Sequence, residues 1–347
     1  MTAPASIDAL QQSPPVAALP APAPNAEHDR AAWLRWRQKG LGGSDAAAIV
    51  GLDPFRSAMM VWLEKTGMLP VDHAAEDEPM RWGRRFESVI VEEFEQRTDL
   101  RVGAQQLGAV HPERPHLRAT LDGFVYEGQA EEAAPLGIYE AKTASRRAWD
   151  WLAGVPDHVQ VQVQHNLAVT GLGHAWVATL LLSPVPRLVI RELERDDAAI
   201  DVLVQLEDAF WQRVLEQRPP AADSGEATAE ALRRAFSDPV AGQSVELTAE
   251  GLELVRQRSR AKAEETAAAA RRQGAENALM AMLGGAEIGL VNGREVLTWK
   301  RFEQQRLDVD ALRQRHPKIA ARFTKPVASR RLVFKQLATT EEPGNDE

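Results

Sequence analysis

Two carboxylates and one amine lie in two short segments of the sequence and could together hold a metal ion. Asp122 ends the first segment, and Glu140 and Lys142 flank Ala141 in the second. Such a group is costly to bury unless something binds it. Mg²⁺ suits it, because Mg²⁺ takes oxygen ligands from one or two carboxylates and keeps waters and phosphate oxygens. The alternative is an exposed ion pair between Glu140 and Lys142, with Asp122 in a surface turn.

The elements that must position these side chains are predicted to be two short strands. Residues 117–121 and 137–142 have the composition of strands, and Gly123 and residues 128–135 indicate a turn and a loop between them. A hairpin is the simplest connection. Because alternate side chains of a strand share a face, the two charged side chains of the second strand point the same way. The carboxylate of Asp122, at the end of the first strand, can therefore lie next to these two side chains.

Two predicted helices carry further polar candidates. Residues 80–98 place apolar side chains at helical spacing, and Glu87 lies at the edge of their face. A partly buried carboxylate needs a partner, which is either the same metal ion or a neighbouring arginine. Residues 156–170 are predicted to form a helix that ends at a glycine. The Gln162 amide on this helix could hold a phosphate or the attacking water, or it could belong to an ordinary polar surface.

A candidate anion site lies near the start of the ordered chain. Gly42, Gly43 and Ser44 precede a predicted helix, and free backbone N–H groups at the start of a helix attract anions. Arg37 adds a planar fork that can bind phosphate through two hydrogen bonds. The alternative is a capped helix with a surface arginine.

The composition of the chain excludes several kinds of site and several locations for the protein. The 347 residues include no cysteine, which excludes disulfides and thiolate sites. No apolar run is long enough to span a membrane, and the N-terminus lacks the features of a signal peptide. We therefore expect a soluble intracellular protein. The net charge of −9 argues against coating nucleic acid nonspecifically, but it does not exclude a local basic groove.

Changes in composition divide the chain into five parts. The tails are predicted to be disordered, one rich in proline and alanine and the other acidic. In order, the parts are residues 1–28 (tail), 29–218 (main domain), 219–248 (linker), 249–336 (a long helix, a hairpin turning at Asn292-Gly293 and a basic segment) and 337–347 (tail). Between residues 306 and 335, nine basic and two acidic side chains give a net charge of +7. That segment could contact phosphates or form a solvated surface.

The candidate motifs occur in the order of a known family. They are Trp33…Arg37…Gly42-Gly-Ser-Asp-Ala-Ala-Ala-Ile49, Trp82-Gly-Arg-Arg-Phe-Glu87, Ala119-Thr-Leu-Asp-Gly123, Glu140-Ala-Lys142 and Gln162-Val-Gln-His-Asn-Leu-Ala-Val-Thr-Gly171. Over residues 31–195 the sequence resembles the YqaJ-type viral recombinases, in the lambda-exonuclease branch of the PD-(D/E)XK nucleases. The long helix, the hairpin and the basic end also resemble an extension seen in phage members.

The resemblance implies an α/β (α+β) restriction-endonuclease-like fold, with a mixed central sheet flanked by helices, and a site for two Mg²⁺ or Mn²⁺ ions. The roles that it implies are metal binding by Asp122, Glu140 and the Ala141 carbonyl, a second metal or its water held by Glu87, and orientation or deprotonation of the attacking water by Lys142. Gln162 matches the family's helix glutamine. Lambda exonuclease binds a 5′-phosphate at the positions that match Arg37, Ser44 and Thr120.

Two departures from the family pattern stand in the first strand. Leu121 replaces a proline that many relatives have before the aspartate, which affects the end of the strand more than the chemistry. Thr120 stands where lambda exonuclease has serine, so the hydroxyl is kept.

The activity that the resemblance implies is metal-dependent 5′→3′ exonuclease digestion of double-stranded DNA ends, leaving 3′ single-stranded tails. The partners that it suggests are DNA ends, a single-strand annealing recombinase and further copies of the same chain, in the cytoplasm of a bacterium or phage-infected cell. Two alternatives remain open from the residues. One is an endonuclease directed at particular structures or single strands, and the other is a noncatalytic DNA-binding recombination module.

Overall fold

The computed structural model describes residues 29–69, 78–103, 107–128, 134–145, 148–325 and 330–335. The expected tails, 1–28 and 337–347, lie outside these residues. The chain divides into two compact units, Met1–Ser237 and Asp238–Glu347, which are described separately. Among the described residues, no helix is both long and apolar enough to cross a membrane.

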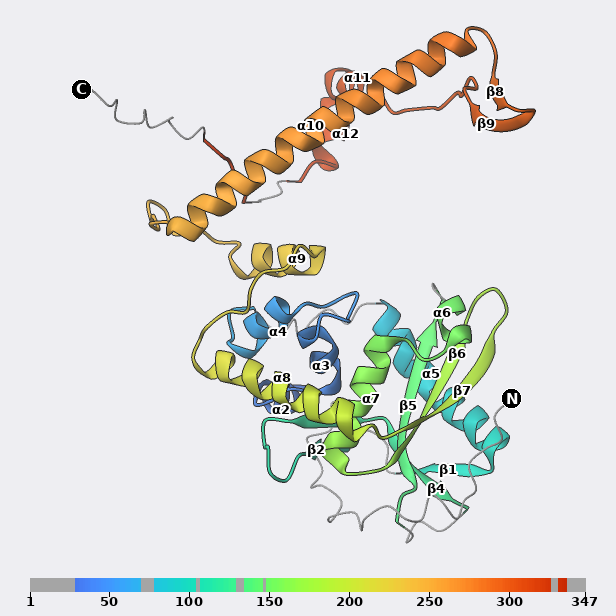
Figure 1. Cartoon of the computed structure of the whole chain (residues 1–347), viewed down its shortest axis with the longest axis vertical. Coiled ribbons are helices and arrows are strands. Elements are labelled where there is room, and N and C mark those ends of the chain that lie inside the picture. Colours follow the sequence, from blue (N-terminus) through green and yellow to red (C-terminus); the bar gives the residue numbers. More distant parts are fainter. Residues whose placement is uncertain are drawn as a thin grey trace. The chain divides into compact units, whose positions relative to one another are not determined.

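A five-stranded mixed sheet forms the centre of the first unit (Figure 1). Its strands, in spatial order, are β1 (Leu100–Gly103), β4 (Gly123–Glu127), β5 (Gly137–Ala144), β6 (His174–Leu181) and β7 (Arg187–Glu194). β5 and β6 are parallel, and the other neighbouring pairs are antiparallel. A second, two-stranded sheet pairs β2 (Leu107–Val110) with β3 (Arg118–Leu121).

The hairpin predicted between residues 117–121 and 137–142 is wrong. The strand next to β5 is β4, where Gly123 lies opposite Tyr139, so Gly123 begins a strand instead of forming a turn. The chain bends at Asp122, and β3 before the bend pairs with β2. Local spacing could not reveal this break, because it depends on β1, which approaches so closely that a Cβ on Gly123 would lie 2.7 Å from the side chain of Val102.

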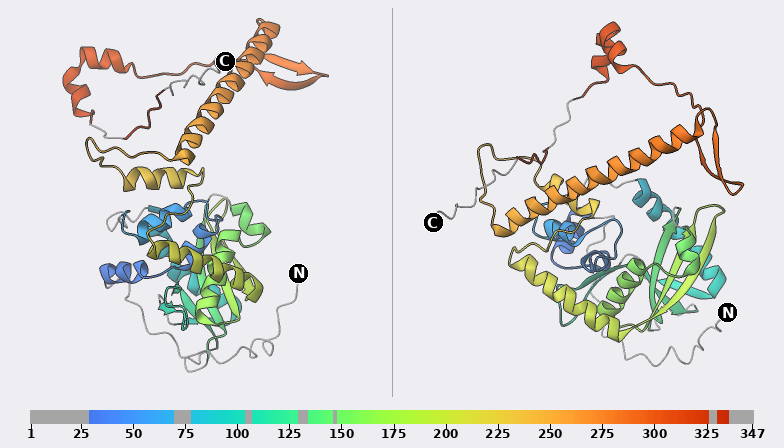
Figure 2. Two further views of the ribbon diagram at one scale, coloured as in Figure 1. Left: turned by 60° about the vertical axis from the view of Figure 1, so that its left-hand side comes forward. Right: turned by 45° about the horizontal axis from the view of Figure 1, so that its top comes forward.

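Helices cover both faces of the central sheet, as Figures 1 and 2 show. On one face, Ile90 and Phe94 of α5 (Glu78–Thr98) pack with Tyr139 of β5. On the other face, Val163 and Leu167 of α7 (Asp157–Thr170) pack with the side chains of β5 and β6, and α6 (Ala148–Ala153) and α8 (Asp197–Leu215) complete this layer. The expected mixed sheet flanked by helices is confirmed.

A third apolar cluster is helical. It joins α3 (Gly43–Ile49) and α4 (Ala58–Lys65) to the end of α8, and α2 (Arg30–Gln38) precedes it. Residues 219–248, expected to be a linker, contain α9 (Glu226–Ala235), and its Ala231 is fully buried against this cluster. α9 is amphipathic, so its apolar side covers α4 while its charged side stays in water.

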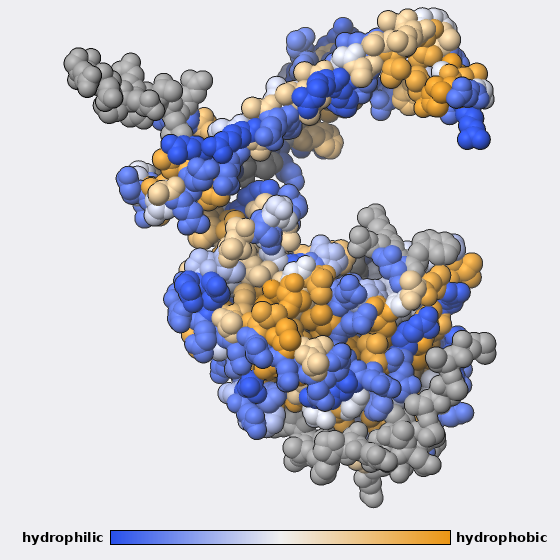
Figure 3. All heavy atoms as spheres, in the orientation of Figure 1, coloured by the Kyte–Doolittle hydropathy of each residue, from blue (hydrophilic) through white to orange (hydrophobic). Residues whose placement is uncertain are grey.

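The second unit is built from α10 (Ala249–Leu283), the hairpin of β8 (Ile288–Val291) and β9 (Arg294–Thr298), α11 (Val309–Arg315) and α12 (Pro317–Arg322). The long helix and the hairpin were both predicted, and Asn292 and Gly293 have the positive φ values of a type I′ turn. None of the described residues from 238 onward is buried. Apolar side chains gather at the end of α10 and on the hairpin, including Met282 and Leu290 (Figure 3).

Candidate active site

The site begins at an edge of β5 that its neighbour leaves uncovered. β4 pairs with β5 only at residues 137–139, so within the described ranges no strand pairs with the following residues of β5 on that side. The bend at Asp122 places a carboxylate there instead, and its Oδ2 accepts a hydrogen bond of 2.9 Å from the Ala141 backbone N–H. The bend therefore sets one acidic side chain against the main chain of β5.

Glu140 and Lys142 lie on the α7 face of β5 and contact each other. Lys142 Nζ is 2.6 Å from Glu140 Oε1. Gln162 of α7 bridges them, donating through Nε2 to Glu140 Oε1 at 2.6 Å and accepting from Lys142 Nζ at 3.3 Å. Glu140 is only 2% exposed, so the alternative of an exposed surface ion pair does not describe this pair.

Glu87 approaches the same group from the opposite side of the sheet. It is half-buried on α5, and its charge acts on Asp122, Tyr139 and Lys142. Three acidic side chains from a helix, a bend and a strand therefore share one electrostatic environment with a single lysine.

The pKa values show how unfavourable this crowding is. Burial and the neighbouring Glu140 raise the pKa of Asp122 to about 8, although Lys142 acts in the opposite direction. Burial by itself would lower the pKa of Lys142, but Glu140 and Asp122 outweigh it and raise that pKa above its usual value. Lys142 is thus an ammonium at neutral pH, and the acidic side chains around it outnumber it.

A hard divalent cation fits the donors present. The carboxylates of Asp122, Glu140 and Glu87 and the main-chain carbonyl of Ala141 offer only oxygen atoms, the ligands that Mg²⁺ and Mn²⁺ accept. A bound cation would also relieve the repulsion that keeps Asp122 protonated. With the side chains as they stand, no three acidic, histidine or cysteine side chains in the described ranges are arranged around one metal position. Glu140 Oε1 is engaged by Lys142 and Gln162.

A second polar cluster surrounds the start of α3. Asp45 is fully buried and accepts hydrogen bonds from Gly42 N at 3.0 Å and from Arg56 Nη1 at 2.8 Å, and Lys65 Nζ lies 2.8 Å from it. Arg37 Nη2 donates to Ser44 Oγ at 3.3 Å. Burial would raise the pKa of Asp45, but Lys65, Arg56 and Arg37 hold it well below its usual value.

The two clusters adjoin through α7 and β3. Gly43 packs so closely on α7 that a Cβ would lie 2.7 Å from Gln162 Cγ. The residue before the glycines, Leu41, accepts a hydrogen bond of 2.8 Å from Arg118 N at the start of β3, the strand that carries half-buried Thr120. The elements that carry Ser44, Thr120 and Gln162 therefore pack against one another.

Comparisons with known proteins identify the family of the chain. Residues 32–173 match the model of the YqaJ-like viral recombinase domain. The chain is 30% identical over 320 residues to the uncharacterized protein YqaJ of Bacillus subtilis (strain 168), covering 91% of this chain and 97% of that protein. The chain belongs to the YqaJ-like viral recombinase family. The match to the Bacillus protein extends well beyond the recombinase domain.

Two solved structures with weaker similarity to this YqaJ-family protein are described as exonucleases. An alkaline exonuclease of Laribacter hongkongensis, LHK-Exo, is 17% identical with a TM-score of 0.43, and the alignment covers 54% of this chain and 93% of that one. A phage-related exonuclease of Haemophilus somnus is 11% identical with a TM-score of 0.37, and the alignment covers 51% and 96% of the two chains.

Sequence reasoning missed several polar residues of the site in this YqaJ-family chain. Asn166 follows Gln162 by one helical turn, and its Nδ2 lies 3.5 Å from Glu140 Oε2. The sequence indicates Asp45 only as a possible cap of α3, a role that its bond with the Gly42 N–H fits, and not as the centre of an ion-pair cluster. Arg56 and Lys65 carry no local signal, because only folding brings them to Asp45.

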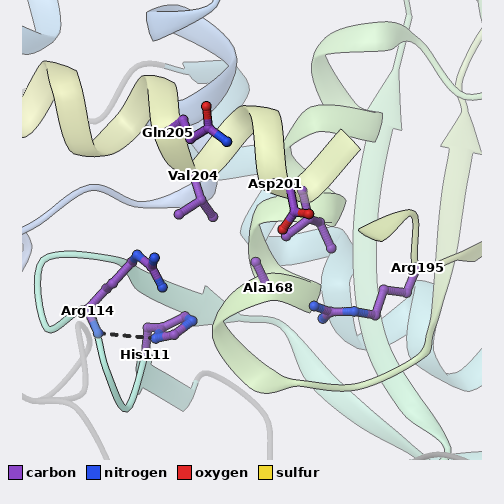
Figure 4. A pocket seen from close by; sticks show the side chains of 8 residues that line it. His111, Arg114, Ala168, Arg195, Asp201, Val204 and Gln205 are labelled. Carbon is purple, nitrogen blue, oxygen red and sulfur yellow. Dashed lines mark hydrogen bonds between the residues drawn. The ribbon is translucent and has the colours of Figure 1, made fainter. Parts of the chain in front are cut away.

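A separate pocket of about 200 Å³ lies between α7, α8 and the β2–β3 connection (Figure 4). His111, Arg114, Arg195 and Asp201 line it. Both arginines already bind protein groups, Arg114 the carboxylate of Asp208 and Arg195 the carbonyl of Leu167. None of the acidic cluster lines this pocket, so it is not part of the candidate active site.

Proposed function

We propose that this protein is a Mg²⁺- or Mn²⁺-dependent deoxyribonuclease that digests double-stranded DNA ends in the 5′→3′ direction and leaves 3′ single-stranded tails. The observation that supports the proposal is the cluster of Asp122, Glu140 and Lys142 at the uncovered edge of β5, on which the charge of Glu87 also acts. Membership of the YqaJ-like family supports the same chemistry.

In the proposed reaction, a water oxygen bonds to phosphorus and the bond to the 3′-oxygen breaks, giving a 5′-phosphate and a 3′-hydroxyl. Two bound divalent ions would activate the water and stabilise the leaving oxygen. Asp122, Glu140 and the Ala141 carbonyl would hold one ion, and Glu87 the second ion or its water. Lys142 is charged, so it orients the attacking water by donating a hydrogen bond, and Gln162 fixes Lys142 and Glu140 relative to each other.

The end of the DNA would be held by the second cluster. Arg37 and Ser44 already share a hydrogen bond, and Thr120 lies on the strand that leads to Asp122. A guanidinium and two hydroxyls suit a terminal 5′-phosphate. In this proposal, the grip on the phosphate gives the enzyme its direction.

The test is digestion of linear duplex DNA with or without a 5′-phosphate, in Mg²⁺, in Mn²⁺ and in EDTA. We expect Mg²⁺-dependent loss of the 5′-phosphorylated strand, and closed circular DNA should remain intact. Arg37→Ala should reduce the preference for 5′-phosphate. Cutting of the circle would favour an endonuclease, and the absence of hydrolysis with either metal would refute the proposal.

Substitutions in the acidic cluster sharpen this test. Glu140→Ala and Lys142→Ala should abolish hydrolysis while duplex binding, measured by gel shift, persists, because neither residue is proposed to hold the DNA backbone. Lys262→Ala is a matched control, since Lys262 is exposed on α10 and pairs with Glu265. Activity in the Lys142→Ala protein equal to that of the control would contradict the assigned role.

A further inference from the structure

A buried ion pair lies behind the candidate site and belongs to neither polar cluster. His165 of α7 and Glu207 of α8 are both fully buried, and His165 Nδ1 is 2.7 Å from Glu207 Oε1. The other ring nitrogen, Nε2, is 2.8 Å from the main-chain carbonyl oxygen of Arg118, the first residue of β3. One imidazole therefore connects two helices and a strand.

The acceptors determine the charge of this imidazole. A carboxylate and a carbonyl oxygen both accept hydrogen bonds, so both ring nitrogens must carry hydrogen for both contacts to form. Burial would lower the pKa of His165, but Glu207 more than offsets it, and the pKa is raised. A buried ion pair contributes little net stability compared with apolar packing. Its main effect is the geometry that it imposes on the groups that it joins.

The joined elements are those that carry the proposed active site. His165 lies three positions after Gln162, which bridges Glu140 and Lys142. Arg118 opens the strand that runs through Thr120 to the bend at Asp122, and its N–H donates to Leu41 just before α3. A displacement of α7 from β3 would therefore separate the Gln162 bridge from the Asp122 bend.

We propose that Glu207 orients the ring of His165, so that the bond of His165 to the Arg118 carbonyl locks α7 to β3 and aligns Gln162, Glu140 and Asp122 for catalysis. This inference rests on the proposed nuclease function. Neither residue touches the reacting groups, so both act through the elements that they hold.

The chain offers a conservative variant and a disruptive variant at one position. In Glu207→Gln, the new amide N–H can donate to Nδ1 of a neutral His165, while Nε2–H still donates to Arg118. In Glu207→Leu, the volume is kept but Nδ1 loses its partner. Gln205→Leu is the matched control, because Gln205 is exposed on the same helix.

The kinetic test measures kcat and KM for a 5′-phosphorylated duplex well below the melting temperature. We expect Glu207→Leu to lower kcat by about 100-fold, as a misplacement of about 1 Å can do, with KM unchanged. Glu207→Gln and Gln205→Leu should retain kcat close to that of the wild type. Equal kcat for Glu207→Leu and the control, or equal loss in Glu207→Gln and Glu207→Leu, would overturn the proposal.

A second measurement does not depend on activity. Amide hydrogen exchange of peptides covering residues 118–122 and 160–167 should rise in Glu207→Leu and stay unchanged in Glu207→Gln. If the wild type does not cleave DNA, the proposed function fails, and the exchange data still judge the positioning role. Unchanged exchange in Glu207→Leu would refute that role.

If Glu207→Leu does not fold, His165→Asn carries the same test. The shorter amide keeps the bond to Glu207 and loses the bond to Arg118. Exchange should then rise in residues 118–122, and kcat should fall. Wild-type exchange and kcat in this variant would overturn the proposal.

Discussion

At the scale of single residues, the chemistry of the site follows from burial and crowding. Asp122 is held against the Ala141 N–H, and that bond favours its ionised form, yet burial and Glu140 raise its pKa to about 8. Lys142 is driven toward its charged form by the same carboxylates. The site is therefore short of positive charge, and a divalent cation is the group that would restore the balance.

Asp122 should make the stability of the metal-free protein depend on pH. Its carboxyl titrates at about 8 when folded, against a usual 3.8. Since the folded pKa is raised, this carboxyl stabilises the fold fully below about pH 4, and the contribution is lost as the pH rises to about 8. Asp122→Asn has no such proton to lose. We expect it to be more stable than the wild type in EDTA at pH 8, and similar in stability at pH 4.

Melting temperatures in EDTA across this pH range measure the difference. Mg²⁺ at pH 8 should raise the melting temperature of the wild type by mass action and have little effect on Asp122→Asn. The assignment would be contradicted if both proteins lost stability equally between pH 4 and pH 8.

At the scale of secondary-structure elements, one bend and one close helix contact build the site. The bend between β3 and β4 leaves part of β5 uncovered, and Asp122 occupies that edge. The contact between α3 and α7 needs a glycine, because a Cβ on Gly43 would lie 2.7 Å from Gln162 Cγ and 2.9 Å from Asn166 Oδ1. The Arg37–Ser44 cluster and the acidic cluster can adjoin only because that side chain is absent.

Gly43→Ala should therefore weaken both stability and catalysis. The added methyl group pushes α3 away from α7, which should cost about 1–3 kcal/mol of unfolding free energy, as overpacking usually does. It should also lower kcat by displacing Gln162. Chemical denaturation and duplex digestion measure the two effects.

Gly154→Ala is the matched control, since a Cβ at Gly154 meets nothing within 4 Å. It should leave both quantities unchanged. A Gly43→Ala protein as stable and as active as this control would show that α3 and α7 have room to separate without consequence.

At the scale of the whole molecule, the chain divides into a unit with a core and a unit without one. The buried apolar side chains of the described ranges all precede residue 238. α9 belongs to the first unit, because it covers Trp62 and Leu63 of α4. The basic residues between 306 and 335 belong to the second unit, where they could add phosphate contacts.

Two truncations separate these contributions. Residues 1–237 should fold with nearly the full stability of that unit, whereas residues 1–218 should lose about 2 kcal/mol, because removing α9 exposes apolar side chains. Urea denaturation measures the difference. Equal stability of the two fragments would show that α9 does not complete the core.

The longer fragment also tests the basic segment. If that segment contacts DNA, duplex binding by residues 1–237 should weaken less steeply with salt than binding by the full chain, since each lost phosphate contact reduces the slope by about 0.9. Equal salt dependence of duplex binding in the two proteins would indicate that the segment is a solvated surface that does not contact DNA.

The sequence by itself determined the chemical groups and the local elements. Asp122, Glu140, Lys142 and Gln162 were predicted as site residues from residue type and spacing, and α7, α10 and the β8–β9 turn follow from patterns that act within a few residues. Helical periodicity and turn chemistry are local, so they can be recognised in an isolated chain.

Only the tertiary structure decided how these groups meet. The bend that separates β3 from β4, the gathering of Arg56 and Lys65 around Asp45, and the contact of Glu207 with His165 each join residues distant in sequence. The burial that raises the pKa of Asp122 also exists only in the packed protein. Side-chain charge and propensity are fixed by residue type, but desolvation and partner choice are properties of the fold, because they depend on which distant segments exclude the water.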